Sequence, residues 1–172
     1  MLVPILLGLA WNGQDTAFLV LLAISFFSDA LDGWIARSFN LRTELGARLD
    51  SFSDFFLYGT MALGGWWLWP HIMLQERVTV LLLLACLLAP TLAGLLKFHR
   101  TTSYHTWAVK LSALAIGAGG LLLFAGGPSW PFHLALPVSL YAATEQIIIT
   151  WISATPHSNV PTLWHAMRSP SA

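Results

Sequence analysis

The chain has 172 residues and a formal net charge of zero, and 56% of its residues are hydrophobic while only 9% are charged. Soluble globular domains carry about 25% charged residues, so this composition excludes an ordinary soluble domain and predicts an integral membrane protein. The single cysteine, Cys86, excludes an internal disulfide. The expected partners include membrane lipids and no nucleic acid.

Long uncharged runs, separated by turn-forming residues, predict an all-α, polytopic membrane protein built as a bundle of six transmembrane helices. The expected helices are, in chain order, residues 1–11, 16–37, 48–70, 77–97, 106–126 and 131–153. The breakers between them are Asn12-Gly13, Trp69-Pro70, Gly126-Gly127-Pro128 and Thr155-Pro156. Residues 1–153 form the expected transmembrane domain, and residues 154–172 form an irregular cytoplasmic tail rich in Pro, Ser and His.

The first expected helix is too short to cross a hydrocarbon core of about 30 Å. A signal peptide would explain a short apolar start, but residues 1–11 lack a basic region and a small-residue cleavage site. We therefore expect that the first transmembrane helix is truncated, so that the chain lacks its beginning.

The basic residues predict which helix ends face the cytoplasm. With six crossings, one side of the membrane receives Arg37, Arg42, Arg48, Lys97, Arg100, Lys110 and Arg168. The other side receives only Arg77. Lys and Arg accumulate in cytoplasmic segments, so the first side is expected to be cytoplasmic. The expected location is a bacterial inner (plasma) membrane.

Four aspartates lie close together in the sequence, at Asp29, Asp32, Asp50 and Asp54. Carboxylates are costly in such an apolar chain, so they need a function. The first two are three residues apart and the last two are four apart, so each pair projects from one face of a helix. Two facing helices would bring four hard oxygen donors together, and such donors suit Mg²⁺ or Mn²⁺.

Small residues and an arginine accompany these aspartates. A helical glycine costs about 1 kcal/mol relative to alanine, and close approach of a ligand to the backbone at Gly33 and Gly46 would offset that cost. Ala36 keeps the neighbouring surface low, and Arg37 presents planar donors suited to phosphate oxygens. The set predicts a pocket for a metal-bound diphosphate. Helix packing explains a lone glycine better, but it explains the whole set poorly.

The complete pattern is Asp29-x2-Asp32-Gly33-x2-Ala36-Arg37-x8-Gly46-x3-Asp50-x3-Asp54. It resembles, at every fixed position, the signature of the CDP-alcohol phosphotransferase (CDP-alcohol phosphatidyltransferase) family, and the six-helix layout extends the resemblance. The N-terminus departs from the family, whose members usually begin with an amphipathic segment and a full first helix.

The resemblance implies transfer of a substituted phosphate group from a CDP-linked lipid, such as CDP-diacylglycerol, to a small alcohol, with release of CMP. It implies two Mg²⁺ or Mn²⁺ ions, and the metal ligands would be Asp29, Asp32, Asp50 and Asp54. Asp54 would also be the catalytic general base. The cytidine diphosphate would bind at Gly33, Ala36, Arg37 and Gly46. A homodimer is expected, with its active site facing the cytoplasm.

A second group of polar residues lies in the next cytoplasmic connection. Lys97, Arg100, His105 and Lys110 are candidates for binding an anionic acceptor, such as a sugar- or glycerol-phosphate. For Lys97 and Arg100, placement by the positive-inside rule is an equally good explanation. The leading hypothesis for the acceptor is glycerol 3-phosphate, which would give phosphatidylglycerophosphate. Serine and inositol phosphate stay open as acceptors.

Two other classes of protein are alternatives to an enzyme, and the first of them would use the same carboxylates. A divalent-cation or proton transporter would often show broken helices near the midplane and internal repeats, whereas this chain clusters its acids towards one face and has no obvious repeat. A catalytically silent membrane scaffold would not need the intact aspartates. An enzyme of phospholipid synthesis is therefore the favoured hypothesis.

Overall fold

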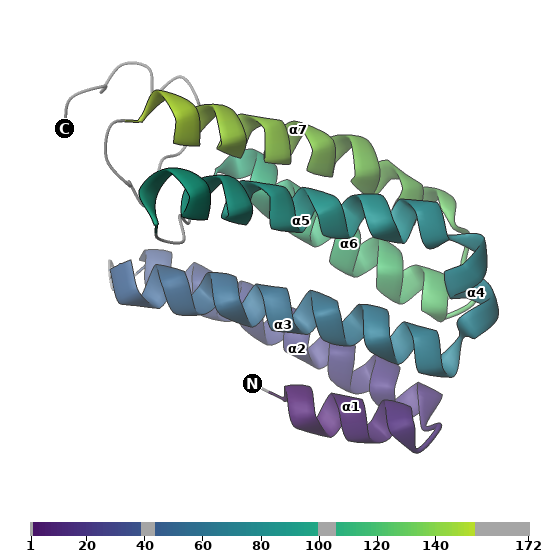
Figure 1. Cartoon of the computed structure of the whole chain (residues 1–172). Helices are drawn as coiled ribbons and strands as arrows, with labels where there is room; N and C mark the ends of the chain where they lie inside the picture. The colour runs from purple at the N-terminus through teal and green to yellow at the C-terminus, as the bar shows by residue number, and fades with distance from the viewer. Residues whose placement is uncertain (1, 39–43, 100–105, 154–172) are drawn as a thin grey trace. The chain divides into compact units, whose positions relative to one another are not determined.

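The chain is helical throughout its described regular structure (Figure 1). The computed structural model describes residues 2–38, 44–99 and 106–153, but not the side chains of 33–38, 44, 45 and 47–51. The helices are α1 (Val3–Trp11), α2 (Asp15–Ser38), α3 (Glu44–Leu68), α4 (Pro70–Gln75), α5 (Arg77–Phe98), α6 (Trp107–Phe124) and α7 (Trp130–Ile152). The predicted all-α fold is confirmed, and each of the six predicted helices has a counterpart.

Glycine and proline mark the helix boundaries. Gly13 follows α1 with φ +70°, and Gly126 follows α6 with φ +82°. Both φ values lie in the left-handed region, where glycine has no Cβ penalty. The predicted break at Trp69-Pro70 is present, but Pro70 also opens the short helix α4. Proline is tolerated at the first position of a helix, so the interpretation of Pro70 as a helix end alone misses this element.

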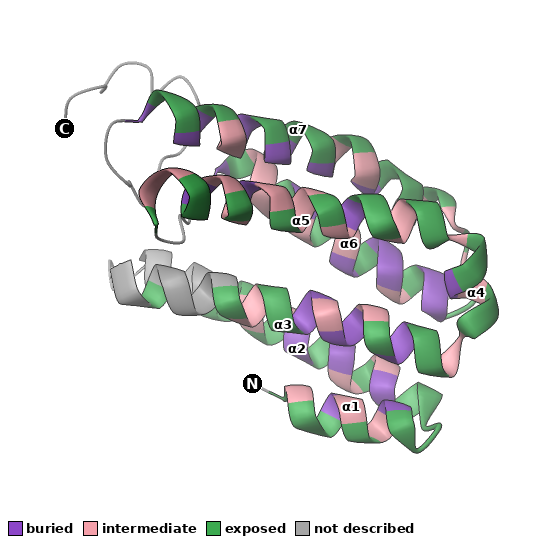
Figure 2. Ribbon diagram, viewed as in Figure 1, coloured by how far each residue is buried: buried purple, intermediate pink, exposed green. Residues whose placement is uncertain are grey.

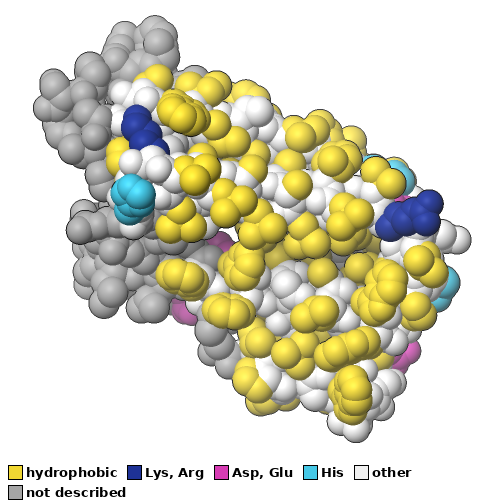
Figure 3. Space-filling view, in the orientation of Figure 1, with side chains coloured by type: hydrophobic (Ala, Val, Ile, Leu, Met, Phe, Trp, Pro, Cys, Tyr) yellow, Lys and Arg dark blue, Asp and Glu magenta, His cyan; other side chains and the backbone are white. Residues whose placement is uncertain are grey.

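Three of the helices in the described residues are long and apolar enough to cross a membrane by length and composition. They are α5, α6 and α7, with 22, 18 and 23 residues. Helices α2 and α3 are as long, with 24 and 25 residues, and they carry the acidic motif. Figure 3 shows hydrophobic side chains over much of the visible surface, with Lys and Arg drawn towards helix ends. This distribution is the one a lipid-facing surface requires.

The chain divides into two compact units. Unit 1 comprises Met1–Val80 and Gly120–Ser129, and unit 2 comprises Leu81–Gly119 and Trp130–Ala172. Unit 1 therefore holds α1 to α4, together with the start of α5 and the end of α6. Unit 2 holds the remainder of α5 and α6 and all of α7.

Within unit 1, α3 packs against α1 and α2, and Figure 2 shows buried residues on these three helices. Phe18 of α2 is fully buried. Its ring occupies the space that a Cβ would take at Gly64 of α3. A larger residue at Gly64 would therefore push α2 and α3 apart.

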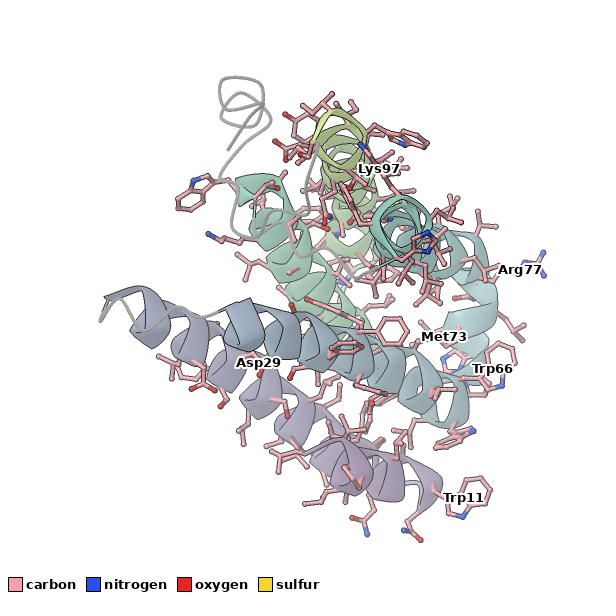
Figure 4. The ribbon with its side chains drawn as sticks, turned by 60° about the vertical axis from the view of Figure 1, so that its left-hand side comes forward. Trp11, Asp29, Trp66, Met73, Arg77 and Lys97 are labelled. Atoms are coloured by element: carbon pink, nitrogen blue, oxygen red, sulfur yellow. The ribbon has the colours of Figure 1, made fainter. Side chains whose placement is uncertain are left out.

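Aromatic rings gather at the end of unit 1 that lies away from the acidic motif. Trp11 and Trp67 meet edge to face with ring centroids 5.3 Å apart, and Trp69 stacks on Phe124 with centroids 4.9 Å apart. Figure 4 labels Trp11 and Trp66 at this end. Tryptophan is enriched at membrane–water interfaces, so this end fits the side of the membrane opposite to the motif.

Within unit 2, α6 and α7 approach closely at two places. A Cβ added to Gly119 would lie 2.8 Å from the Cα of Phe132. The buried hydroxyls of Ser112 and Ser139 form a hydrogen bond of 2.7 Å. The Ser139 hydroxyl donates its single proton to the carbonyl of Ala135, so Ser112 is the donor to Ser139. Small residues and interhelical hydrogen bonds are the usual means of packing helices in membranes.

Replacing Gly119 by alanine should destabilise the protein, because the new methyl group would meet the backbone of α7 rather than a flexible side chain. Overpacking of this kind costs about 1–3 kcal/mol. The matched control is Gly59→Ala in α3, since a Cβ at Gly59 meets no atom within 4 Å. Thermal unfolding in detergent should show a lower midpoint for Gly119→Ala and no loss for Gly59→Ala. Equal midpoints for the two variants would contradict the close approach.

Candidate active site

The four aspartates of the motif lie on two neighbouring helices. Asp29 and Asp32 belong to α2, and Asp50 and Asp54 belong to α3. Asp29 and Asp54 are half-buried and Asp32 is exposed. The side chain of Asp50 lies outside the described residues. Figure 4 shows Asp29 where α2 and α3 run side by side.

An aromatic contact between α2 and α3 lies about one helical turn from Asp29 and Asp54. The ring centroids of Phe26 on α2 and Tyr58 on α3 are 5.4 Å apart. Asp29 follows Phe26 by three residues, and Asp54 precedes Tyr58 by four. Each carboxylate therefore shares a helix face with one ring of the contact. Since α2 and α3 run in opposite directions (Figure 1), Asp29 and Asp54 lie at the same end of the pair and at the same level.

The electrostatics of Tyr58 agree with this arrangement. Tyr58 is only 7% exposed, and the charges of both Asp54 and Asp29 act on its hydroxyl, that of Asp54 more strongly. Two carboxylates from different helices thus lie within electrostatic range of one buried hydroxyl. The motif does not include Tyr58. The sequence did contain a signal for it, because Tyr58 continues the row of residues spaced by four through Asp50 and Asp54.

The residues predicted to hold metal are oxygen donors only. In the part of the chain whose side chains are described, no group of three or more His, Cys, Asp or Glu residues is placed to hold a metal ion. That part excludes the side chain of Asp50. Asp29 and Asp54 present carboxylates on facing turns, which is the donor chemistry that Mg²⁺ and Mn²⁺ prefer. The donor type therefore fits a hard divalent cation, and the full ligand set stays a prediction.

The residues predicted to bind nucleotide lie at the same end of α2 and α3. Gly33, Ala36 and Arg37 belong to the last turns of α2, and Gly46 belongs to the first turn of α3. Gly46 is exposed. Positions 33, 36 and 37 fall outside the described side chains, so their contact with a cytidine diphosphate stays a prediction.

The predicted acceptor residues that are described belong to unit 2. Lys110 lies in the first turn of α6 and is half-buried, and its ammonium is 4.6 Å from the ring centroid of Trp107. A cation over an indole face is stabilised by the ring quadrupole. Lys97 lies near the end of α5. Arg100 and His105 lie outside the described residues.

Lys97 caps the end of α7. Its ammonium donates hydrogen bonds to the carbonyls of Thr150, Trp151 and Ser153, at 3.0, 2.7 and 2.8 Å. The last carbonyls of a helix have no partner within the helix, and a cation at this end also favours the helix dipole. An ammonium has three N–H donors, so all of them are used. Binding an acceptor phosphate would require Lys97 to break at least one of these bonds.

Replacing Lys97 by methionine should lower stability more than it changes acceptor binding. The substitution keeps an unbranched side chain, one atom shorter, and removes three charge-assisted hydrogen bonds, for an expected loss of about 1–3 kcal/mol. Thermal unfolding and the KM for the acceptor should be measured together. Arg77→Met, at the exposed start of the same helix, is the control and should change neither. A raised KM with unchanged stability would instead assign Lys97 to the acceptor site.

Comparison with known proteins identifies the family of this chain. The CDP-alcohol phosphatidyltransferase family matches residues 1–155 of the chain. Two relatives from Mycobacterium tuberculosis, strains CDC 1551 / Oshkosh and ATCC 25618 / H37Rv, are each named "Probable phosphatidylglycerophosphate synthase". Each is 30% identical over 168 residues, which covers 88% of this chain and 73% of the relative. No solved structure gives a significant match. With a family match that spans both acid-bearing helices and most of the remaining sequence, the chain belongs to the CDP-alcohol phosphatidyltransferase family.

Proposed function

We propose that this protein synthesises phosphatidylglycerophosphate, by moving the phosphatidyl group of CDP-diacylglycerol to glycerol 3-phosphate with release of CMP. The family match across residues 1–155 supports the transferase reaction. The observation that carries the choice of acceptor is the likeness to relatives named probable phosphatidylglycerophosphate synthases. The charges of Asp29 on α2 and Asp54 on α3 both influence the buried Tyr58 hydroxyl, and this supports a catalytic site between the two helices.

The residues of the motif divide the work of this reaction. Asp29, Asp32, Asp50 and Asp54 supply oxygen donors for two Mg²⁺ or Mn²⁺ ions. Such ions neutralise charge on a diphosphate and on the departing CMP. Asp54 accepts the proton of the acceptor hydroxyl. The acceptor oxygen then bonds to the lipid-side phosphorus as the bond from that phosphorus to the CMP oxygen breaks.

Small residues and basic residues hold the nucleotide and the acceptor. Gly33, Ala36 and Gly46 leave room for the cytidine diphosphate, and Arg37 binds its phosphate oxygens. The acceptor phosphate binds Arg100, His105 and Lys110, and Lys97 joins this set only if it releases at least one carbonyl of α7. Two crossings, α3 and α5, separate the acidic motif from this second segment, so helix counting returns it to the same side of the membrane. The positive-inside rule makes that side cytoplasmic.

The proposed setting is a bacterial inner membrane, with a homodimer as the assembly. The organism of the relatives supports the bacterial setting, and the dimer rests on family resemblance. Residues 1–153 would form the transmembrane domain, and the tail from 154 to 172, which lies outside the described residues, would be cytoplasmic.

The test is to incubate the purified protein with CDP-diacylglycerol and Mg²⁺ or Mn²⁺ and to follow CMP release. Parallel reactions contain glycerol 3-phosphate, serine or inositol phosphate, and each is repeated with a chelator. We expect release with glycerol 3-phosphate and none with chelator. Release with serine alone would change the acceptor and keep the reaction class. No release with any acceptor, together with metal-ion uptake in proteoliposomes, would favour a transporter.

A further inference from the structure

Tyr58 follows Asp54 by one helical turn on α3, and it is not one of the eight fixed residues of the family motif. Its ring is buried and packs against Phe26 across the interface of α2 and α3, with centroids 5.4 Å apart. Asp54 precedes it by one helical turn on the same face of α3, and Asp29 stands at the same level on α2. The buried ring of Tyr58 therefore lies about one helical turn from both carboxylates, on the interface between α2 and α3.

The direction of the tyrosine side chain follows from helix geometry. Side chains in an α-helix lean towards the N-terminus of the helix. For Tyr58 this direction leads along α3 towards Asp54. The ring contact with Phe26 fixes the apolar body of the side chain, so the hydroxyl extends from that contact towards the carboxylates. The electrostatic influence of the Asp54 and Asp29 charges on the hydroxyl agrees with this direction.

A buried phenol hydroxyl near two carboxylates is suited to donate a hydrogen bond to one of them. Buried tyrosine hydroxyls need a hydrogen-bond partner, and carboxylates accept the strongest O–H···O⁻ hydrogen bonds. We propose that Tyr58 is a positioning residue whose hydroxyl donates a hydrogen bond to the Asp54 carboxylate and so orients it for metal binding and proton transfer. This inference rests on the proposed function of the motif.

The proposed bond leaves Asp54 free to act. A carboxylate has two oxygens with about four acceptor sites, so it can accept a proton donor on one side and still bind a cation on another. Groups that orient metal ligands in this way contribute about 10–100-fold in metal affinity or activity. Phenylalanine at position 58 keeps the ring and its contact with Phe26 and removes only the donor.

The experiment compares the unmodified protein with Tyr58→Phe and with Tyr141→Phe. Tyr141 lies on α7 and is 64% exposed, so it controls for the loss of a phenol hydroxyl elsewhere. Mn²⁺ affinity is measured by calorimetric titration, alongside the Mn²⁺ dependence of CMP release, the KM for CDP-diacylglycerol and the melting temperature. We expect Tyr58→Phe to weaken Mn²⁺ binding by about 10–100-fold, with unchanged lipid KM at saturating Mn²⁺. Tyr141→Phe should match the unmodified protein.

The outcomes separate this inference from the function on which it rests. If the unmodified protein turns over and binds Mn²⁺ while Tyr58→Phe binds Mn²⁺ equally well, the positioning role is overturned alone. If the unmodified protein releases no CMP with any acceptor, the proposed function falls and the inference with it. A Tyr58→Phe protein that fails to fold, or that melts lower with unchanged Mn²⁺ affinity, would give the hydroxyl a purely structural role and overturn the proposal.

Discussion

Replacing Asp54 by asparagine should lower CMP release by about 10²–10⁴-fold, the usual contribution of a general base. Asparagine keeps the size of the side chain but cannot accept the proton of the acceptor hydroxyl. Asp54 is half-buried on α3 and level with Asp29 on α2, so the change falls within the site and not at its edge. Single-turnover rates and CDP-diacylglycerol affinity should be measured at saturating Mn²⁺, where we expect the rate to fall much further than the affinity.

Asp15→Asn is the matched control for this variant. Asp15 is exposed at the start of α2, where its carboxylate accepts a hydrogen bond of 2.6 Å from the backbone N–H of Thr16. Asparagine is an equally good residue at a helix start, so activity should persist. If Asp54→Asn instead loses CDP-diacylglycerol affinity at an unchanged single-turnover rate, the base role of Asp54 is wrong and only its role as a metal ligand remains.

Much of the fold follows from the sequence because a membrane imposes strong rules on it. Long uncharged runs must form helices in lipid, and their ends are marked by residues such as Gly13 and Gly126, whose left-handed φ angles favour glycine. The short helix α4 is different. Pro70 can end one helix or begin the next, and only the path of the chain after α3 decides between them.

The acidic site was predictable to the extent that it depends on spacing along single helices. The expectation that α2 and α3 face each other with their aspartates is supported by Asp29 and Asp54, which lie at one level. The aromatic pair that aligns them could not be predicted, because the partner of Phe26 depends on the register between two helices. A shift of one turn would have placed a residue other than Tyr58 in contact with it.

The role of Lys97 shows a second limit of sequence interpretation. Its position at a helix end suits both the positive-inside rule and phosphate binding, and neither explanation involves a particular partner. The partners in the structure are backbone carbonyls of α7. Every residue has a carbonyl, so no sequence pattern marks these three carbonyls as the hydrogen-bond partners of Lys97. The acceptor-binding role of Lys97 therefore stays a prediction, and it would require at least one of these hydrogen bonds to break.

Asp50→Asn is expected to reduce CMP release to background. Asp50 stands one turn before Asp54 in the α3 row that continues to Tyr58, and by family resemblance it ligates metal between the two helices. Losing one charged ligand removes several kcal/mol of transition-state stabilisation, and about 1.36 kcal/mol corresponds to each tenfold in rate. Like Asp54→Asn, which removes another proposed metal ligand, this variant should also need far more Mn²⁺ for any residual activity.

The measurement pairs CMP release with a Mn²⁺ titration and a melting curve, beside the Asp15→Asn control. Since asparagine preserves shape, Asp50→Asn should melt close to the unmodified protein in the absence of metal. Near-normal CMP release by Asp50→Asn would contradict the assignment of two metal ions to this site. The comparison with Asp54→Asn then divides the roles within α3. A variant whose turnover recovers at saturating Mn²⁺ has lost a metal ligand only, whereas one whose turnover stays low at saturating Mn²⁺ has also lost the base. Because the two residues share one helix face, a difference between them would reflect chemistry rather than a general disturbance of α3.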